Sequence, residues 1–224
     1  MQIQKCKINS KIILLIFKNQ FEITSTFLRF QEHYESPKFR GKIFTLAEFK
    51  KWYTDVKGRF SYYTDWNGFN IPSQILQPFY SGKFNPLSVK EEKLLQKLQS
   101  EKGKFYVIGI HKDINNLSAL LKHEIAHGLF YTDKIYKKKV LAILQKFNLE
   151  EIKRELKSSE GYHDDVLDDE VHAYSLDTVR NLQTKIPQEM KDELLAVYNQ
   201  TLRKNNISLE KFKLGNCFAE KIQK

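Results

Sequence analysis

Cysteine is scarce in this sequence of 224 residues, since only Cys6 and Cys217 are present, near opposite ends of the chain. Neither belongs to a Cys-x-x-Cys pair, which excludes a cysteine-ligated zinc site and a scaffold built on disulfides. We expect both thiols to be reduced, as is usual in a cytoplasmic protein.

Long apolar runs are also missing. The one apolar run near the N-terminus, 12–17, is too short to span a membrane and short for the hydrophobic part of a signal peptide. Lys18 and Asn19 follow it instead of a small-residue cleavage site. We therefore interpret this run as a buried strand or a helix fragment. We expect a cytoplasmic protein without a membrane span, although export that reads no N-terminal signal is compatible with the sequence.

Positive charge is in excess, at a net +10, but it comes mainly from lysine and little from arginine. The lysines are scattered, and their densest cluster is only Lys137 to Lys139. Nucleic-acid sites generally use arginine for bidentate contacts. A solvated, lysine-rich surface is therefore the favoured interpretation, and association with nucleic acid is the less favoured alternative.

Two capping boxes mark the starts of helices, Thr45 to Glu48 and Ser88 to Glu91. Between these helices, residues 59–87 contain many aromatic residues and turn formers but no regular pattern, so we expect an irregular loop. The aromatic side chains either pack on one another, which we favour, or form a lid over a cleft. A short β-rich run, 105–110, then predicts a buried strand.

His-Glu-x-x-His follows that strand, on a predicted helix from about Leu117 to Tyr131. His123 and His127 lie one turn apart on one face, where two imidazoles bind one Zn²⁺. The carboxylate of Glu124 then reaches a water on the metal. The motif is short and occurs by chance in many helices, so a third ligand is needed to support the prediction.

Glu170 is the best third ligand, because it lies on a predicted helix that begins at residue 164 or 165 and ends near residue 182. Ala173 on that helix allows close approach to the motif helix, and Asp177 is expected to orient a ligand imidazole. Three alternatives stay open: that Glu170 is an exposed carboxylate, that His163 is the third ligand, or that His111 lines the cleft. His111 is, however, more typical of a surface histidine.

His123-Glu-Ile-Ala-His127 followed by Glu170-Val-His-Ala-Tyr174 resembles the gluzincin metallopeptidases, most of all the short-spacer type of the anthrax lethal factor catalytic domain. The resemblance covers about residues 105–180. It implies a zincin-like α+β fold, mostly helical, with a small sheet whose edge lies beside the motif helix. It also assigns oxyanion stabilisation to Tyr162, for which packing is the alternative. The sequence departs from the metzincin pattern and from the thermolysin-like Asn-Glu-x-x-Ser-Asp signature.

Two functional hypotheses follow. The first is a zinc-dependent metalloprotease, with His123, His127 and Glu170 as ligands, a zinc-bound water as nucleophile and Glu124 as general base. Its substrate is a protein or peptide in extended form, placed along the strand at 105–110. The second is a non-catalytic, zinc-containing protein-binding module. We expect residues 1–104 to form an N-terminal α+β region of unknown role, packed on a catalytic part at 105–224, or a single domain over 1–224.

Overall fold

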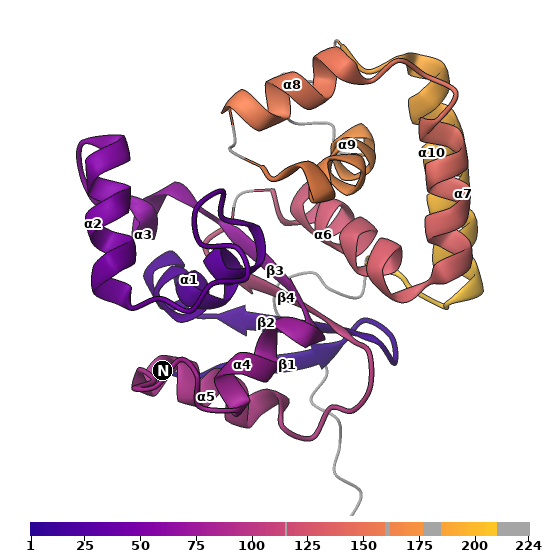
Figure 1. The fold of residues 1–224 in the computed structure, drawn as a ribbon. Helices are drawn as coiled ribbons and strands as arrows, with labels where there is room; N and C mark the ends of the chain where they lie inside the picture. Colours follow the sequence, from indigo (N-terminus) through magenta and orange to yellow (C-terminus); the bar gives the residue numbers. More distant parts are fainter. Residues whose placement is uncertain (115, 160–161, 177–184, 210–224) are drawn as a thin grey trace, which may run out of the picture.

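A four-stranded sheet is the centre of the protein in the computed structural model, which describes residues 1–114, 116–159, 162–176 and 185–209 (Figure 1). Its strands are β1 (Gln4–Lys7), β2 (Ile12–Phe17), β3 (Gly68–Pro72) and β4 (Tyr106–His111). Their order is β1-β2-β4-β3, with β2 and β4 parallel and the two outer pairs antiparallel. This confirms the predicted α+β class, and the sheet draws strands from both sides of residue 104.

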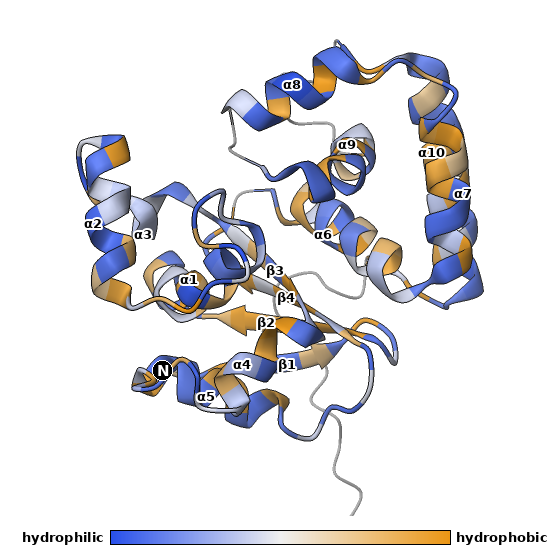
Figure 2. Cartoon of the chain, in the orientation of Figure 1, coloured by the Kyte–Doolittle hydropathy of each residue, from blue (hydrophilic) through white to orange (hydrophobic). Residues whose placement is uncertain are grey.

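Helices cover both faces of the sheet (Figure 1). The helices are α1 (Gln20–Glu35), α2 (Leu46–Lys57), α3 (Tyr62–Asp65), α4 (Gln77–Tyr80), α5 (Val89–Leu98), α6 (Leu117–Thr132), α7 (Lys134–Leu144), α8 (Glu150–Ser159), α9 (Leu167–Leu176) and α10 (Gln188–Lys204), with 3-10 turns η1 (Ser73–Leu76) and η2 (Asp164–Val166). Because side chains alternate along a strand, Leu14 enters the core shared with α6, α7, α9 and α10, while Leu15 enters the core shared with α1. Figure 2 shows β2 in the hydrophobic colour, and all six of its residues are buried. Its pairing with β1 and β4 shows that the run 12–17 is a buried strand, not a helix fragment.

The helix boundaries follow the capping signals. Both predicted capping boxes are present, at the starts of α2 and α5. Gly58 ends α2 in the left-handed region, at a φ of 77° that favours glycine. Asn116 accepts a hydrogen bond from the backbone at the start of α6, so the motif helix begins where its cap predicts.

The first half of the chain differs from the expectation in two ways. Helix α1 was not predicted, and it packs its apolar face on the sheet, with Phe27 against Phe69. Residues 59–87 are not an irregular loop, because they contain α3, β3, η1 and α4. Their aromatic side chains are largely buried in the core on the α1 side, and this tertiary packing outweighs the local turn signals.

The predicted substrate edge at 105–110 is wrong. Strand β4 is paired on both sides, with β2 and with β3, so it has no free edge to which a peptide strand could add. Strand β3 contacts α6 and is an edge strand, with one side unpaired. The sheet edge therefore lies beside the motif helix, as expected, but a different strand forms it.

One further expectation, on the cysteines, is corrected here. Cys6 is disulfide-bonded, not the reduced thiol that we expected, and the second cysteine, Cys217, lies outside the described residues. The end of the predicted helix at 177–182 also lies outside them. Across the described ranges, none of the helices has the length and apolar character that crossing a membrane requires.

A buried ion pair fixes α1 to α5. Arg29 places Nε 2.7 Å from Oε1 of Glu91 and Nη2 2.6 Å from Oε2, and it also donates to the carbonyl oxygens of Phe84 and Pro86. Both charged side chains are almost fully buried. Removing one charge of such a pair leaves the other in the core without compensation.

We expect Glu91→Gln to lower the free energy of unfolding by about 3–5 kcal/mol, the usual cost of breaking a buried pair. Urea unfolding followed by circular dichroism measures this change. Glu92→Gln is the matched control, because Glu92 occupies the same helical turn but is exposed. Equal stability of the two variants would contradict the assignment.

Candidate metal centre

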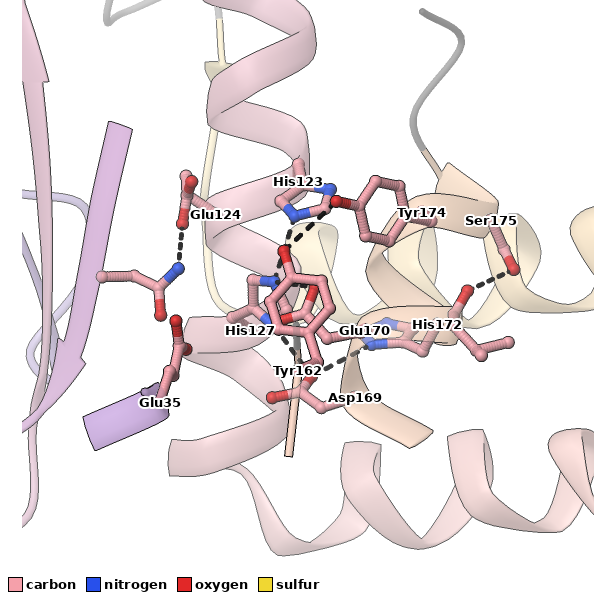
Figure 3. Close-up of polar contacts among 12 residues, drawn as sticks. Glu35, His123, Glu124, His127, Tyr162, Asp169, Glu170, His172, Tyr174 and Ser175 are labelled. Atoms are coloured by element: carbon pink, nitrogen blue, oxygen red, sulfur yellow. Dashed lines mark hydrogen bonds and ion pairs between the residues drawn. The ribbon is translucent and has the colours of Figure 1, made fainter. Parts of the chain in front are cut away.

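Helix α6 presents three residues of the motif at the centre of the molecule. His123, Glu124 and His127 are all buried, although each has a polar side chain. The helical repeat places the two imidazoles on one face, and their Nε2 atoms lie 3.1 Å apart (Figure 3). Two ring nitrogens at that separation face a common point.

Helix α9 supplies the third residue. Glu170 is buried, so it is not an exposed carboxylate, and its Oε2 lies 3.7 Å from Nε2 of His127. One ligand atom each from His123, His127 and Glu170 lies within 4.8 Å of the others. A tetrahedral zinc ion with bonds of about 2.0–2.1 Å separates its ligands by roughly 3.3 Å, so this donor set fits zinc in both chemistry and spacing.

A second carboxylate on α9 orients the imidazole of His127. Asp169 Oδ1 lies 3.0 Å from Nδ1 of His127, on the ring edge opposite to the ligand atom. Burial opposes the imidazolium of His127, but Asp169 and Glu170 outweigh it and raise the pKa of His127 well above its ordinary value. Burial also opposes the charge on Asp169, and the contact with His127 nevertheless keeps the pKa of Asp169 below its ordinary value.

This orienting role was assigned to Asp177, which lies outside the described residues. Asp169, the residue before Glu170, is placed to take that role, because its side chain leaves the helix toward Nδ1 of His127. Behind it, Nδ1 of His172 lies 3.5 Å from Asp169 Oδ1, and the hydroxyl of Tyr136 lies 2.6 Å from Nε2 of His172. The imidazole of His127 is thus backed by a buried polar chain, as metal-binding imidazoles commonly are.

A residue of the edge strand β3 holds the carboxylate of Glu124. The side-chain amide of Asn70, on β3, donates to Glu124 Oε2 at 2.6 Å, and Asn70 Oδ1 accepts a hydrogen bond from the hydroxyl of Tyr106. The sequence analysis missed Asn70. The sequence did contain a signal, because Asn70 is a polar residue between two apolar ones, Phe69 and Ile71. Side chains alternate along a strand, so Asn70 points to the opposite face from its two neighbours, the face on which the motif helix packs.

Tyr162 lies over the site from the loop before η2 (Figure 3). Its hydroxyl is 3.2 Å from that of Tyr174, whose ring packs edge-on against His123 at 4.9 Å between centroids. Burial, followed by the charge of Glu170, raises the pKa of Tyr162 well above its ordinary value. Its phenol therefore stays protonated and remains a hydrogen-bond donor at neutral pH.

The rival histidines lie elsewhere. His163 is partly exposed and accepts a hydrogen bond from the backbone N–H of Asp165 as the cap of η2, so it does not join the group of His123, His127 and Glu170. His111 is buried and lies 3.3 Å from Oδ1 of Asn67, which corrects the expectation of a surface histidine.

One further carboxylate reaches the site from α1. Glu35 is the last residue of that helix, and Figure 3 shows it on the side of the site occupied by Glu124. Burial and the negative charge of Glu170 raise its pKa well above the ordinary value. The sequence analysis missed this residue because the helix that carries it was not predicted.

Comparisons with protein-family models, with curated proteins and with solved structures give no match for this chain. Inferences about its chemistry therefore depend on the arrangement of its own residues.

We expect Asp169→Asn to weaken zinc binding by about 10- to 100-fold, because the variant keeps the ligands but loses the carboxylate that orients His127. Competition with a coloured chelator measures the affinity. Asp168→Asn is the matched control, since Asp168 is the preceding residue and forms a half-exposed ion pair with Lys153. Zinc affinity equal to that of the control would show that Asp169 is not an orienting residue.

Proposed function

We propose that this protein is a zinc-dependent metalloprotease of the gluzincin type. The observation that carries the proposal is the convergence of His123, His127 and Glu170 from two helices, with Glu124 beside them but outside the ligand group. Three protein ligands and an open fourth position are typical of catalytic zinc sites, whereas structural sites are closed by four.

Each residue of the site then has a task. When bound, the ion acts as a Lewis acid and lowers the pKa of a coordinated water to about 7. Glu124 accepts the proton of the attacking water and delivers it to the leaving amine. Asn70 fixes the Glu124 carboxylate by its 2.6 Å hydrogen bond, and Tyr162 donates a hydrogen bond to the developing oxyanion.

The open side of β3 offers a place for an extended substrate. The backbone N–H of Asn70 donates to the side-chain Oε1 of Gln31 at 3.3 Å, so this N–H is turned away from β4. A peptide carbonyl that takes the place of the Gln31 side chain adds a strand to the sheet at the level of Glu124. This arrangement favours a peptide bond of an extended segment as the substrate.

The alternative is a non-catalytic, zinc-containing protein-binding module. It predicts bound zinc with no turnover, and it gives no role to the hydrogen bond between Asn70 and Glu124. That hydrogen bond holds the Glu124 carboxylate beside His123, His127 and Glu170, but Glu124 is not one of the three grouped residues. A general base requires such a position, so the protease is the better-supported hypothesis.

We expect Glu124→Gln to keep its zinc and to lose about 10²- to 10⁴-fold in the rate of peptide cleavage, because the general base is removed while the ligands stay. Cleavage of a broad peptide library by mass spectrometry, together with metal content, measures both properties. Glu92→Gln, an exposed carboxylate on α5, is the control. Full activity of Glu124→Gln would refute the mechanism, and zinc-loaded wild type that cleaves no peptide would favour the binding module.

Tyr162→Phe separates the catalytic role of Tyr162 from a packing role. We expect kcat to fall by about 10²- to 10³-fold with zinc content unchanged, since one oxyanion donor is lost. Tyr174→Phe removes the hydroxyl that Tyr162 contacts but leaves the proposed donor, so its loss is expected to stay under about tenfold. Steady-state kinetics on one cleaved peptide makes the comparison, and equal effects of the two variants would assign Tyr162 to packing.

A further inference from the structure

The last turn of α1 places a carboxyl group, that of Glu35, beside the candidate metal site, and the proposed mechanism does not use it. Helix α1 packs on the opposite face of the sheet from α6, and its end reaches the site past the open strand β3. Figure 3 shows the Glu35 side chain on the same side of the site as Glu124. The charges of Glu170, His127 and Glu124 all act on Glu35, which places it within their electrostatic reach.

Glu35 is not positioned as a metal ligand. The group of donor atoms within 4.8 Å of one another contains His123, His127 and Glu170, and Glu35 is not part of it. Its carboxylate instead accepts a hydrogen bond from Nε2 of Gln31, one turn earlier on α1. The same Gln31 side chain accepts from the backbone N–H of Asn70, which places Glu35 near the point of the sheet edge where the extended substrate is proposed to bind.

The carboxyl groups around the site differ in their partners. Asp169 and Glu170 act on the imidazole of His127, and Glu124 accepts a hydrogen bond from the side-chain amide of Asn70. The hydrogen bond that Glu35 accepts comes from the neutral amide of Gln31. Arg40, the closest arginine along the chain, donates to the carbonyl of Tyr34 and pairs with Asp165 at 3.5 Å. Among the described residues, no lysine or arginine forms an ion pair with Glu35.

We propose that Glu35 is a specificity-determining residue, which receives a positively charged alkylammonium group of the substrate next to the scissile bond. A charge-assisted hydrogen bond from an ammonium group gives a half-buried carboxylate the counter-ion that the protein does not provide. Two parts of a peptide carry this chemistry, the free α-amino group and a lysine side chain. The inference rests on the proposed protease function, because it assumes that a peptide bond lies at the metal.

The test uses binding to the zinc-loaded protein, so it does not need turnover. The probes are four zinc-chelating hydroxamates, those of lysine and of norleucine, each with a free and with an acetylated α-amine. N-acetyl-lysine against N-acetyl-norleucine isolates the side-chain ammonium, and norleucine against N-acetyl-norleucine isolates the α-ammonium. Isothermal titration is run on wild type, on Glu35→Gln, and on Glu92→Gln as the exposed-carboxylate control.

We expect one of the two comparisons to favour the charged probe by about tenfold or more in wild type and in Glu92→Gln, a typical worth of a hydrogen bond between charged groups. In Glu35→Gln the ratio of the affinities of the charged and the uncharged probe should fall to about twofold or less. A change that affects the affinities of all four hydroxamates equally leaves this ratio unaltered. A wild-type ratio near one in both comparisons overturns the proposal, even if the variant does not fold. An undiminished ratio in Glu35→Gln also overturns it.

The same samples separate this inference from the proposed function. Peptide cleavage without any charge preference contradicts only the role of Glu35. A charge preference that depends on Glu35, in a protein that cleaves no peptide of the library, contradicts the protease and keeps the recognition of an ammonium group.

Discussion

The contact between the imidazole of His127 and the two carboxylates of α9 is the interaction on which the rest of the structure depends. It places an imidazole, Asp169 and Glu170 together in a region with little access to water, where unpaired charges are very costly. The neighbouring charges reverse the effect of burial on the pKa of both His127 and Asp169. The packing of α6 on α9 is therefore electrostatic at its centre and apolar around it.

This polar centre requires close approach of α6 to the sheet. Gly128 follows His127, and a Cβ atom there would lie 2.9 Å from Cδ1 of Ile12 on β2. A residue larger than glycine at that point would shift the helix away from the strand or force Ile12 to move. The distance from Asn70 to Glu124 depends on the same approach, since one residue is on the sheet and the other on the helix. The position of Glu124 is thus linked to core packing one turn away.

Local signals in the sequence predicted the motif helix, both capping boxes and the grouping of Glu170 with His123 and His127, because caps and helical spacing act over a few residues. They did not predict Glu35, Asn70 or Asp169 as parts of the site. Glu35 lies at the end of a helix that is stabilised by packing its apolar face on the sheet, which local signals do not reveal. Asn70 lies in a short strand flanked by turn-forming residues, so the local pattern indicates a loop. Strand order was also beyond reach, since β4 gains its second neighbour from a segment about 35 residues upstream.

The distribution of charge connects the surface with the site. The chain carries a net +10, yet carboxyl groups gather around the imidazole of His127. Exposed lysines act through water and are screened within about 10 Å, so they favour the approach of acidic segments without fixing their register. The half-buried Glu35 is screened much less, and in our proposal it acts on one atom of the substrate. Under that proposal the preferred substrate has negative charge spread along its length and one positive group beside the scissile bond, so overall charge governs encounter while a single carboxylate governs register.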